Sequence, residues 1–100
     1  MAEHPLAHYR ELDPEAVDQI QQMNAFALSD GELPRKVKIL IAMALDASHG
    51  AVNGVKSLAM QALAEGATKG EIAETLRVAC YVSGAGSVYT AAAALRELDL

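Results

Sequence analysis

The sequence predicts an all-α domain, a compact bundle of five to six helices around a central antiparallel helix pair. Two observations support this fold class. Apolar residues recur at spacings of three and four along most of the chain, which is the period of an amphipathic helix. No stretch alternates apolar and polar residues for long enough to form a strand. We therefore expect one domain over the 100 residues, in which 1–12 is a possible flexible arm.

The central pair is expected within residues 34–68. Its first helix is almost wholly apolar over 37–45, so it should be covered on all sides. The second helix has apolar residues on one face, at positions 52, 55, 58, 59, 62 and 63. A polar elbow at 46–50 joins the two helices, and Gly66 suits the left-handed conformation that ends many helices.

Capping residues mark the flanking helices. Asp13 followed by Pro14 is typical of a helix start. Residues 68–71, Thr-Lys-Gly-Glu, have the form of a capping box. Ser48 and Ser87 are expected to cap the helices that follow them. The first helix carries an apolar stripe that is expected to pack around the central pair, formed by Ala16, Ile20, Met23 and Ala27.

Composition and charge argue against several classes of protein. The net charge of −5 disfavours a nucleic-acid partner, because phosphate contacts need clustered Lys and Arg. The single cysteine cannot form an internal disulfide, so a cytoplasmic location is expected. Residues 78–95 carry no charge, but glycines interrupt them, so two buried helices are expected rather than a membrane span. No cofactor is predicted.

The last helix is rich in small residues, with alanine at every position from 91 to 94. Such a face lets helices approach closely and could seal against another subunit. Since symmetric assemblies of identical chains are the usual outcome for small soluble proteins, a homo-oligomer is expected.

Two segments carry a resemblance to a known family. Residues 33–38, Leu-Pro-Arg-Lys-Val-Lys, lead into the apolar helix, and residues 62–72 read Ala-Leu-Ala-Glu-Gly-Ala-Thr-Lys-Gly-Glu-Ile. With the stretch 76–84 and the alanine-rich last helix, they make the chain resemble the carboxymuconolactone decarboxylase and alkylhydroperoxidase-like family over about residues 14–98. The resemblance implies an all-helical fold, assembly as trimers or hexamers, and a site at the elbow near subunit interfaces.

The catalytic residues of that family are not matched here. One branch is a thiol peroxidase with a CxxC pair, a histidine and an upstream glutamate, and the other decarboxylates a lactone in aromatic-acid breakdown. Counted back from Gly66, the cysteine positions fall on Ala51 and Gly54, the histidine position on Leu58 and the glutamate position on about Ile39. None of these side chains transfers a proton or attacks a peroxide, so CxxC peroxidase chemistry is excluded.

His49, in the elbow, is the best single candidate for catalysis. Asp46 could orient its imidazole, which would then act as a general acid or base. Asn53 and Lys56 on the next helix could position a small anionic ligand, assisted by the free N–H groups at that helix start. The alternative is that His49 is a surface residue of the loop and that Asp46 only caps a helix end.

Cys80 and two tyrosines are further candidates. Cys80 lies on an apolar helical face, so it is either inert packing or, with Arg77 one turn earlier, the thiol of a one-cysteine peroxidase. Tyr81 and Tyr89 flank the glycine break at 83–87. They either line a ligand pocket with their hydroxyls or anchor at the edge of the core.

Two clusters of charged residues complete the candidates. His4 and His8, with Glu11, have the spacing of a weak metal site. They do not form a closed set of ligands, so no metal is predicted. The basic residues at 35–38 lie at a helix start, where a solvated face or an intersubunit ion pair is the default reading and a clamp for an anionic substrate is the sharper one.

Three functions are left open by these residues. The first is an enzyme that acts on a small carboxylate or lactone through His49. The second is a non-catalytic oligomeric binding or scaffold protein that has lost the site. The third is an antioxidant protein that uses Cys80 alone.

Overall fold

The structure, a computed structural model that describes residues 6–100, is all-α over that range. In chain order the elements are the short 3-10 helix η1 (Tyr9–Glu11) and the α-helices α1 (Pro14–Leu28), α2 (Arg35–Ser48), α3 (Val52–Ala64), α4 (Lys69–Ser83) and α5 (Gly86–Arg96). No strand occurs in the described residues, so the predicted fold class is confirmed. None of these helices is long and apolar enough to cross a membrane.

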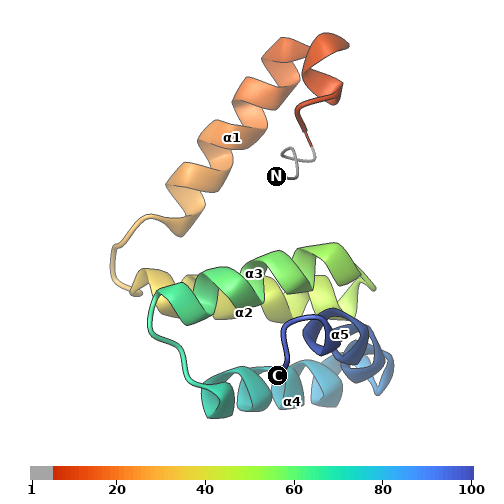
Figure 1. Ribbon diagram of the computed structural model, residues 1–100. Coiled ribbons are helices and arrows are strands. Elements are labelled where there is room, and N and C mark those ends of the chain that lie inside the picture. Colours follow the sequence, from red (N-terminus) through yellow and green to blue (C-terminus); the bar gives the residue numbers. More distant parts are fainter. Residues whose placement is uncertain (1–5) are drawn as a thin grey trace.

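Helices α2 and α3 form the central antiparallel pair, and α4 and α5 cover one side of it (Figure 1). The centre of this four-helix body is dry, since Ile39, Met43 and Val55 are fully buried. Alanines supply much of the remaining core, and Ala59, Ala62 and Ala94 are also fully buried. Small side chains at these positions let the helix backbones approach closely, as the composition predicted.

Three predicted helix ends are confirmed. The Asp13 carboxylate accepts a hydrogen bond of 3.0 Å from the backbone N–H of Ala16. The capping box is complete, because Thr68 Oγ1 accepts from the N–H of Glu71 while the Glu71 carboxylate accepts from the N–H of Thr68. Gly66 follows the end of α3 with a φ of 92°, a conformation that suits glycine.

The two serine caps were predicted wrongly. Ser48 is the last residue of α2, and its hydroxyl donates to the carbonyl of Leu45 one turn back. Ser87 lies inside α5 and is buried, with its hydroxyl 3.5 Å from the carbonyl of Ala79 on α4. In both cases the serine hydroxyl donates a hydrogen bond to a backbone carbonyl within reach, and it therefore does not cap a helix start.

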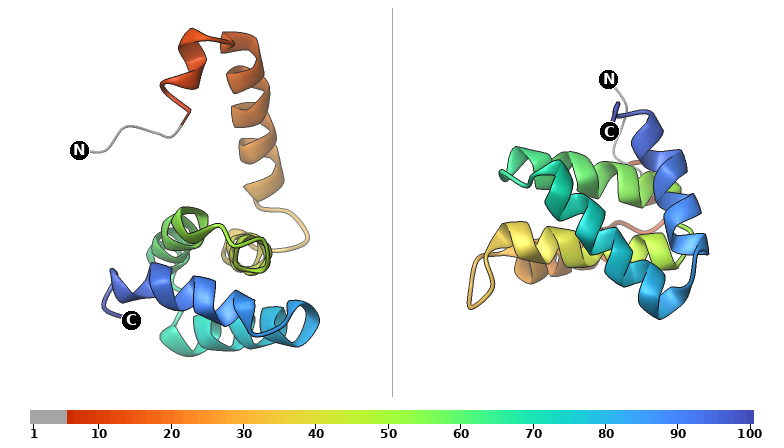
Figure 2. Two further views of the ribbon diagram at one scale, coloured as in Figure 1. Left: turned by 90° about the vertical axis from the view of Figure 1, so that its right-hand side faces the viewer. Right: turned by 90° about the horizontal axis from the view of Figure 1, so that it is seen from below.

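Helix α1 stands away from the body (Figures 1 and 2). It packs against η1 and the beginning of α2, and Val17 is its buried residue. The predicted apolar stripe does not reach the core of its own chain, because Ile20 is 41% exposed, Met23 61% and, beside them, Phe26 76%. The polar connection at 29–34 carries the chain away from α1 before α2 begins, which leaves the stripe in solvent.

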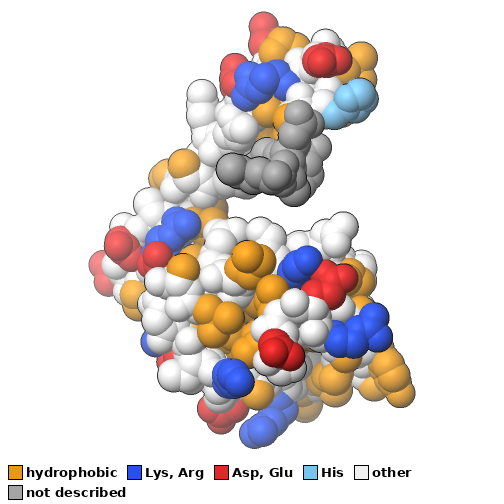
Figure 3. Space-filling view, in the orientation of Figure 1, with side chains coloured by type: hydrophobic (Ala, Val, Ile, Leu, Met, Phe, Trp, Pro, Cys, Tyr) orange, Lys and Arg blue, Asp and Glu red, His pale blue; other side chains and the backbone are white. Residues whose placement is uncertain are grey.

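The apolar helix α2 is also not covered on all sides within one chain. Its core face is buried, but Ile41 is 47% exposed and Leu45 56%. Other hydrophobic side chains lie open on the visible surface of the body (Figure 3), and Met60 on α3 is one of the exposed residues. A single copy therefore leaves apolar surface on several helices.

Candidate functional site

A cleft of about 830 Å³ lies between α1, α2 and α3. Its lining residues are Asn24, Ala25, Ala27, Leu28, Arg35, Ala42, Asp46, Asn53, Gly54, Ser57, Leu58 and Gln61. The wall from α1 comes from the C-terminal half of that helix, and the wall from α2 and α3 comes from residues next to the elbow and one to three turns away from it. A cleft of this size holds a small organic molecule.

Asp46 is placed in the cleft by the absence of a side chain at Gly54. A methyl group added at Gly54 would overlap Oδ2 of Asp46 and lie 2.9 Å from its Cγ. The Asp46 carboxylate therefore occupies the space over α3 that any larger residue would fill. Its side chain is half-buried, and no hydrogen bond or ion pair to it occurs among the described residues.

The elbow holds its shape through the backbone of Asp46. The Asp46 carbonyl accepts from the N–H of His49 at 3.2 Å and from the N–H of Ala51 at 2.9 Å. Gly50 takes a φ of 77°, which lets the chain reverse between the two helices. Asp46 and Asn53, which were predicted as neighbours in the site, are thus brought to the same end of the cleft.

Sequence reasoning missed a polar stripe on α3. Asn53, Ser57 and Gln61 recur every four residues, so they share one helix face, and all three line the cleft. The Gln61 amide donates to the Ser57 hydroxyl at 3.1 Å. The spacing of these polar residues could have predicted the stripe, because it places them on the face of α3 opposite the buried Val55 and Ala59.

Arg35 marks the far end of the cleft. It lies 11 positions before Asp46 on α2, which is about 16 Å along a helix axis at 1.5 Å per residue. Its guanidinium donates to the Leu28 carbonyl at 3.4 Å, and its Nε lies 3.8 Å from the Glu65 carboxylate. A ligand the size of one lactone ring therefore occupies one end of the cleft and not both.

The other members of the basic cluster are engaged within the chain. Lys36 Nζ lies 2.9 Å from the Glu71 carboxylate, and Lys38 Nζ donates to the Ser29 carbonyl. The hydrogen bond from Lys36, with that from the Thr68 backbone, lowers the pKa of Glu71 below its ordinary value of 4.5. These contacts join α2 to α4 and to the connection at 29–34 that precedes α2. The two lysines therefore have structural partners.

His49 and Lys56 do not line the cleft. The side chain of His49 is exposed at the end of α2, and no described side chain bonds to its ring. Lys56 donates to the Glu97 carboxylate, and this contact lowers the pKa of Glu97 below its ordinary value of 4.5. Whether either residue has a catalytic role stays a prediction, but the cleft is built without them.

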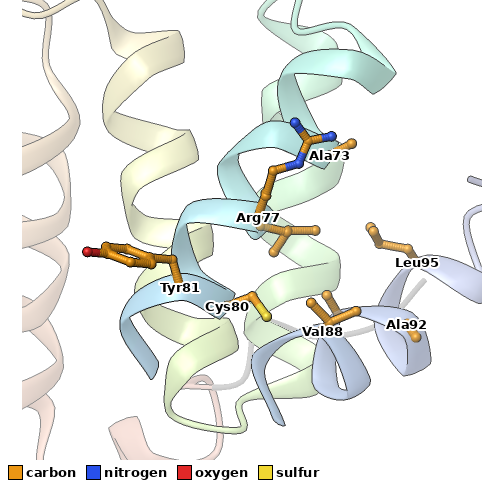
Figure 4. A pocket seen from close by; sticks show the side chains of 9 residues that line it. Ala73, Arg77, Cys80, Tyr81, Val88, Ala92 and Leu95 are labelled. Carbon is orange, nitrogen blue, oxygen red and sulfur yellow. The ribbon is translucent and has the colours of Figure 1, made fainter. Parts of the chain in front are cut away.

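A second depression, of about 580 Å³, lies between α4 and α5. Its lining residues are Ala73, Leu76, Arg77, Cys80, Tyr81, Val88, Ala91, Ala92 and Leu95. Figure 4 shows Cys80 facing Val88 across the gap between the two helices. We call this depression the α4–α5 groove. Cys80 is half-buried in it, whereas Tyr81, which also lines it, is 89% exposed.

The remaining candidates are separate from both sites. Tyr89 is 79% exposed and lines neither the cleft nor the groove. His4 lies outside the described residues, so the pairing of His4 with His8 and Glu11 stays untested. Within residues 6–100 there is no group of three potential metal ligands.

The chain is similar to known proteins of one family. The model of the carboxymuconolactone decarboxylase family matches residues 14–97. The uncharacterised protein H16_B0147 of Cupriavidus necator is 35% identical over 86 residues, which cover 86% of this chain and 76% of that protein. The crystal structure of apo-lpg0406, a carboxymuconolactone decarboxylase family protein from Legionella pneumophila, is similar with a TM-score of 0.85 and 33% identity, over 94% of this chain and 84% of that one.

Proposed function

Because the chain belongs to the carboxymuconolactone decarboxylase family, we propose that it acts on a small carboxylate or lactone at the Asp46 end of the cleft. The observation that carries the proposal is the position of the Asp46 carboxylate. The carboxylate lines the cleft over Gly54, and no described side chain forms a hydrogen bond or ion pair with it. A carboxyl group in this setting is available to exchange a proton with a bound ligand. Gly54 and Leu58, which stand where the peroxidase branch of the family has a cysteine and a histidine, line the same cleft.

The groups around Asp46 favour a lactone ring at this end. The Asn53 amide and the Ser57 hydroxyl can donate hydrogen bonds to a lactone carbonyl. Leu58 and Ala42 supply apolar surface for the ring.

In the proposed reaction, Asp46 transfers a proton to a carbon atom next to the conjugated lactone carbonyl. In a decarboxylation the carbon–carbon bond to the carboxylate breaks, CO₂ leaves, and the bonding electron pair passes into the conjugated carbonyl. The protonated form of Asp46 then delivers its proton to carbon and regains it from water. A positioned general acid of this kind typically contributes a rate factor of about 10²–10⁴.

The test uses carboxymuconolactone, with release of CO₂ as the readout. Asp46→Asn should lower turnover by about 10²-fold or more while the bound ligand remains detectable by calorimetry. Lys56→Gln and His49→Ala are the matched controls and should keep wild-type turnover, because neither side chain lines the cleft. If His49→Ala removes turnover and Asp46→Asn does not, the proton passes through His49, as the sequence had indicated.

A non-catalytic binding protein is the second candidate. It is supported by the inert side chains at the family's catalytic positions, since Gly54 and Leu58 carry no ionisable group. Calorimetric binding of carboxymuconolactone without turnover, by the wild-type protein, would select it. An antioxidant role for Cys80 is favoured less, because the groove around it is apolar apart from Arg77 and holds no second thiol.

A further inference from the structure

Helix α1 has an apolar face that no other residue within 6–100 covers. Ile20, Met23 and Phe26, which we call the arm stripe, are 41%, 61% and 76% exposed. They lie at spacings of three residues along a helix whose own chain buries Val17 and half-buries Ala16 and Leu28. An isolated helix of this length is marginal in water, and most helical stability in proteins comes from packing of an apolar face.

The α4–α5 groove is the complementary shape. It is an open channel of about 580 Å³ between two helices, with a floor made by Leu76, Ala91 and Leu95. Its single charged lining residue is Arg77, for which no ion pair occurs among the described residues. An amphipathic helix that lays its apolar side chains into such a channel is a common mode of recognition.

The arm stripe and the groove of one copy do not meet. Helix α1 extends from one side of the α2–α3 pair, whereas α4 and α5 cover the opposite side (Figures 1 and 2). The six-residue connection at 29–34 joins α1 directly to the start of α2. The chain therefore presents a convex apolar element and a concave apolar element that only a second molecule can bring together.

We propose that the arm stripe of one copy docks into the α4–α5 groove of a second copy of this chain. Charge supports a second copy as the occupant, because α1 carries the acidic Glu15 and no basic residue, while the groove carries Arg77. Asp18 of α1 is already paired with Arg10 of its own chain. Each copy offers both surfaces, so each takes part in two contacts.

The contact also bears on the cleft. Asn24, Ala27 and Leu28 of α1 line the cleft, so a partner that holds α1 also fixes that wall. This inference stands apart from the proposed function, since assembly is measured without any ligand. A protein that assembles as proposed and does not turn over carboxymuconolactone would keep the inference and remove the function.

The first test compares two matched variants by sedimentation and by the reactivity of the native thiol. Wild-type protein should be oligomeric at micromolar concentration, with Cys80 shielded from a maleimide reagent. Phe26→Asp should sediment as a monomer with an unchanged helical spectrum and alkylate Cys80 at least tenfold faster. Met60→Asp changes an equally apolar exposed side chain on α3 and should behave as wild type. A monomeric wild-type protein, or dissociation by Met60→Asp and not by Phe26→Asp, overturns the proposal.

The second test locates the contact by cross-linking and does not depend on a disruptive variant. With Phe26→Cys, oxidation with diamide should join the new thiol of one copy to the native Cys80 of another as a disulfide, because the proposed contact brings the two thiols together. The added substitution Cys80→Ser should remove the cross-linked dimer. A dimer that persists in the Cys80→Ser background would join two copies through position 26, which would place α1 against α1 and overturn the assignment of the groove.

Discussion

Gly54 is the residue whose missing side chain shapes the candidate site. The Asp46 carboxylate occupies the space that a Cβ atom at position 54 would need. No pattern in the sequence predicts this contact, since it depends on how closely α2 and α3 approach after the elbow. Asp46 and Asn53 could be predicted as site residues because both adjoin the elbow in sequence, whereas Arg35 and Gln61 join the site only through the packing of distant turns.

Replacing Gly54 by Ala should separate binding from stability. Alanine is favoured over glycine in a helix by about 1 kcal/mol, so the unfolding midpoint should stay near the wild-type value or rise. The new methyl group displaces the Asp46 carboxylate, so affinity for carboxymuconolactone should fall by about tenfold, the equivalent of one lost hydrogen bond.

A double-mutant cycle provides the control for Gly54. In an Asp46→Ala background the carboxylate is absent, so Gly54→Ala should change the affinity by less than about twofold if the two residues act only through each other. Equal losses in both backgrounds would mean that the methyl group blocks the cleft itself.

Glu71 should make the stability of the protein depend on acid pH. Its pKa lies below the ordinary 4.5 in the folded protein, because the hydrogen bond from Lys36 and that from the Thr68 backbone favour the carboxylate. The stabilisation is therefore complete above pH 4.5 and is lost as the pH falls through the lowered pKa. The difference in unfolding midpoint between wild type and Glu71→Gln should be largest at neutral pH and shrink toward about pH 3. Glu74→Gln, on the same helix, is the control, because no ion pair to Glu74 occurs among the described residues.

At the scale of the helix, local chemistry was the predictable part. Asp13, Thr68 and Gly66 mark their helix ends correctly because each acts on backbone groups within a few residues of itself. Ser48 and Ser87 were assigned wrongly because a hydroxyl has more than one acceptor within reach, and only the folded chain decides between them. Helix caps are thus readable where the side chain has one local partner.

The capping box at the start of α4 should have a measurable energy. Thr68→Ala removes the acceptor for the Glu71 N–H and should destabilise the protein by about 1 kcal/mol. Thr75→Ala on the same helix is the matched control, because the Thr75 hydroxyl bonds only to a carbonyl one turn back, and alanine is the better helix former. Urea unfolding should show the loss for Thr68→Ala alone, with an unchanged slope.

For the whole molecule, the pattern of apolar residues predicted which faces seek cover but not what covers them. Ile20 and Met23 were expected on the core of their own chain, and they lie in solvent beside Phe26. Periodicity reports that a face is apolar and carries no information on whether its partner is in the same copy. The length and direction of the connection at 29–34 decide this, and they are properties of the folded backbone.

Assembly through α1 should couple stability to protein concentration. If folded copies associate through the arm stripe and unfolded chains do not, the unfolding midpoint of the wild type rises with concentration by mass action. Phe26→Asp removes the association, so its midpoint should be lower and independent of concentration.

Because α1 also lines the cleft, a ligand that binds there should raise the association constant by the same factor by which association raises the ligand's affinity. Sedimentation of the wild type with and without saturating carboxymuconolactone measures one factor, and calorimetry at low and high protein concentration measures the other. A factor of one in both measurements would show that the ligand binds independently of the wall that α1 supplies.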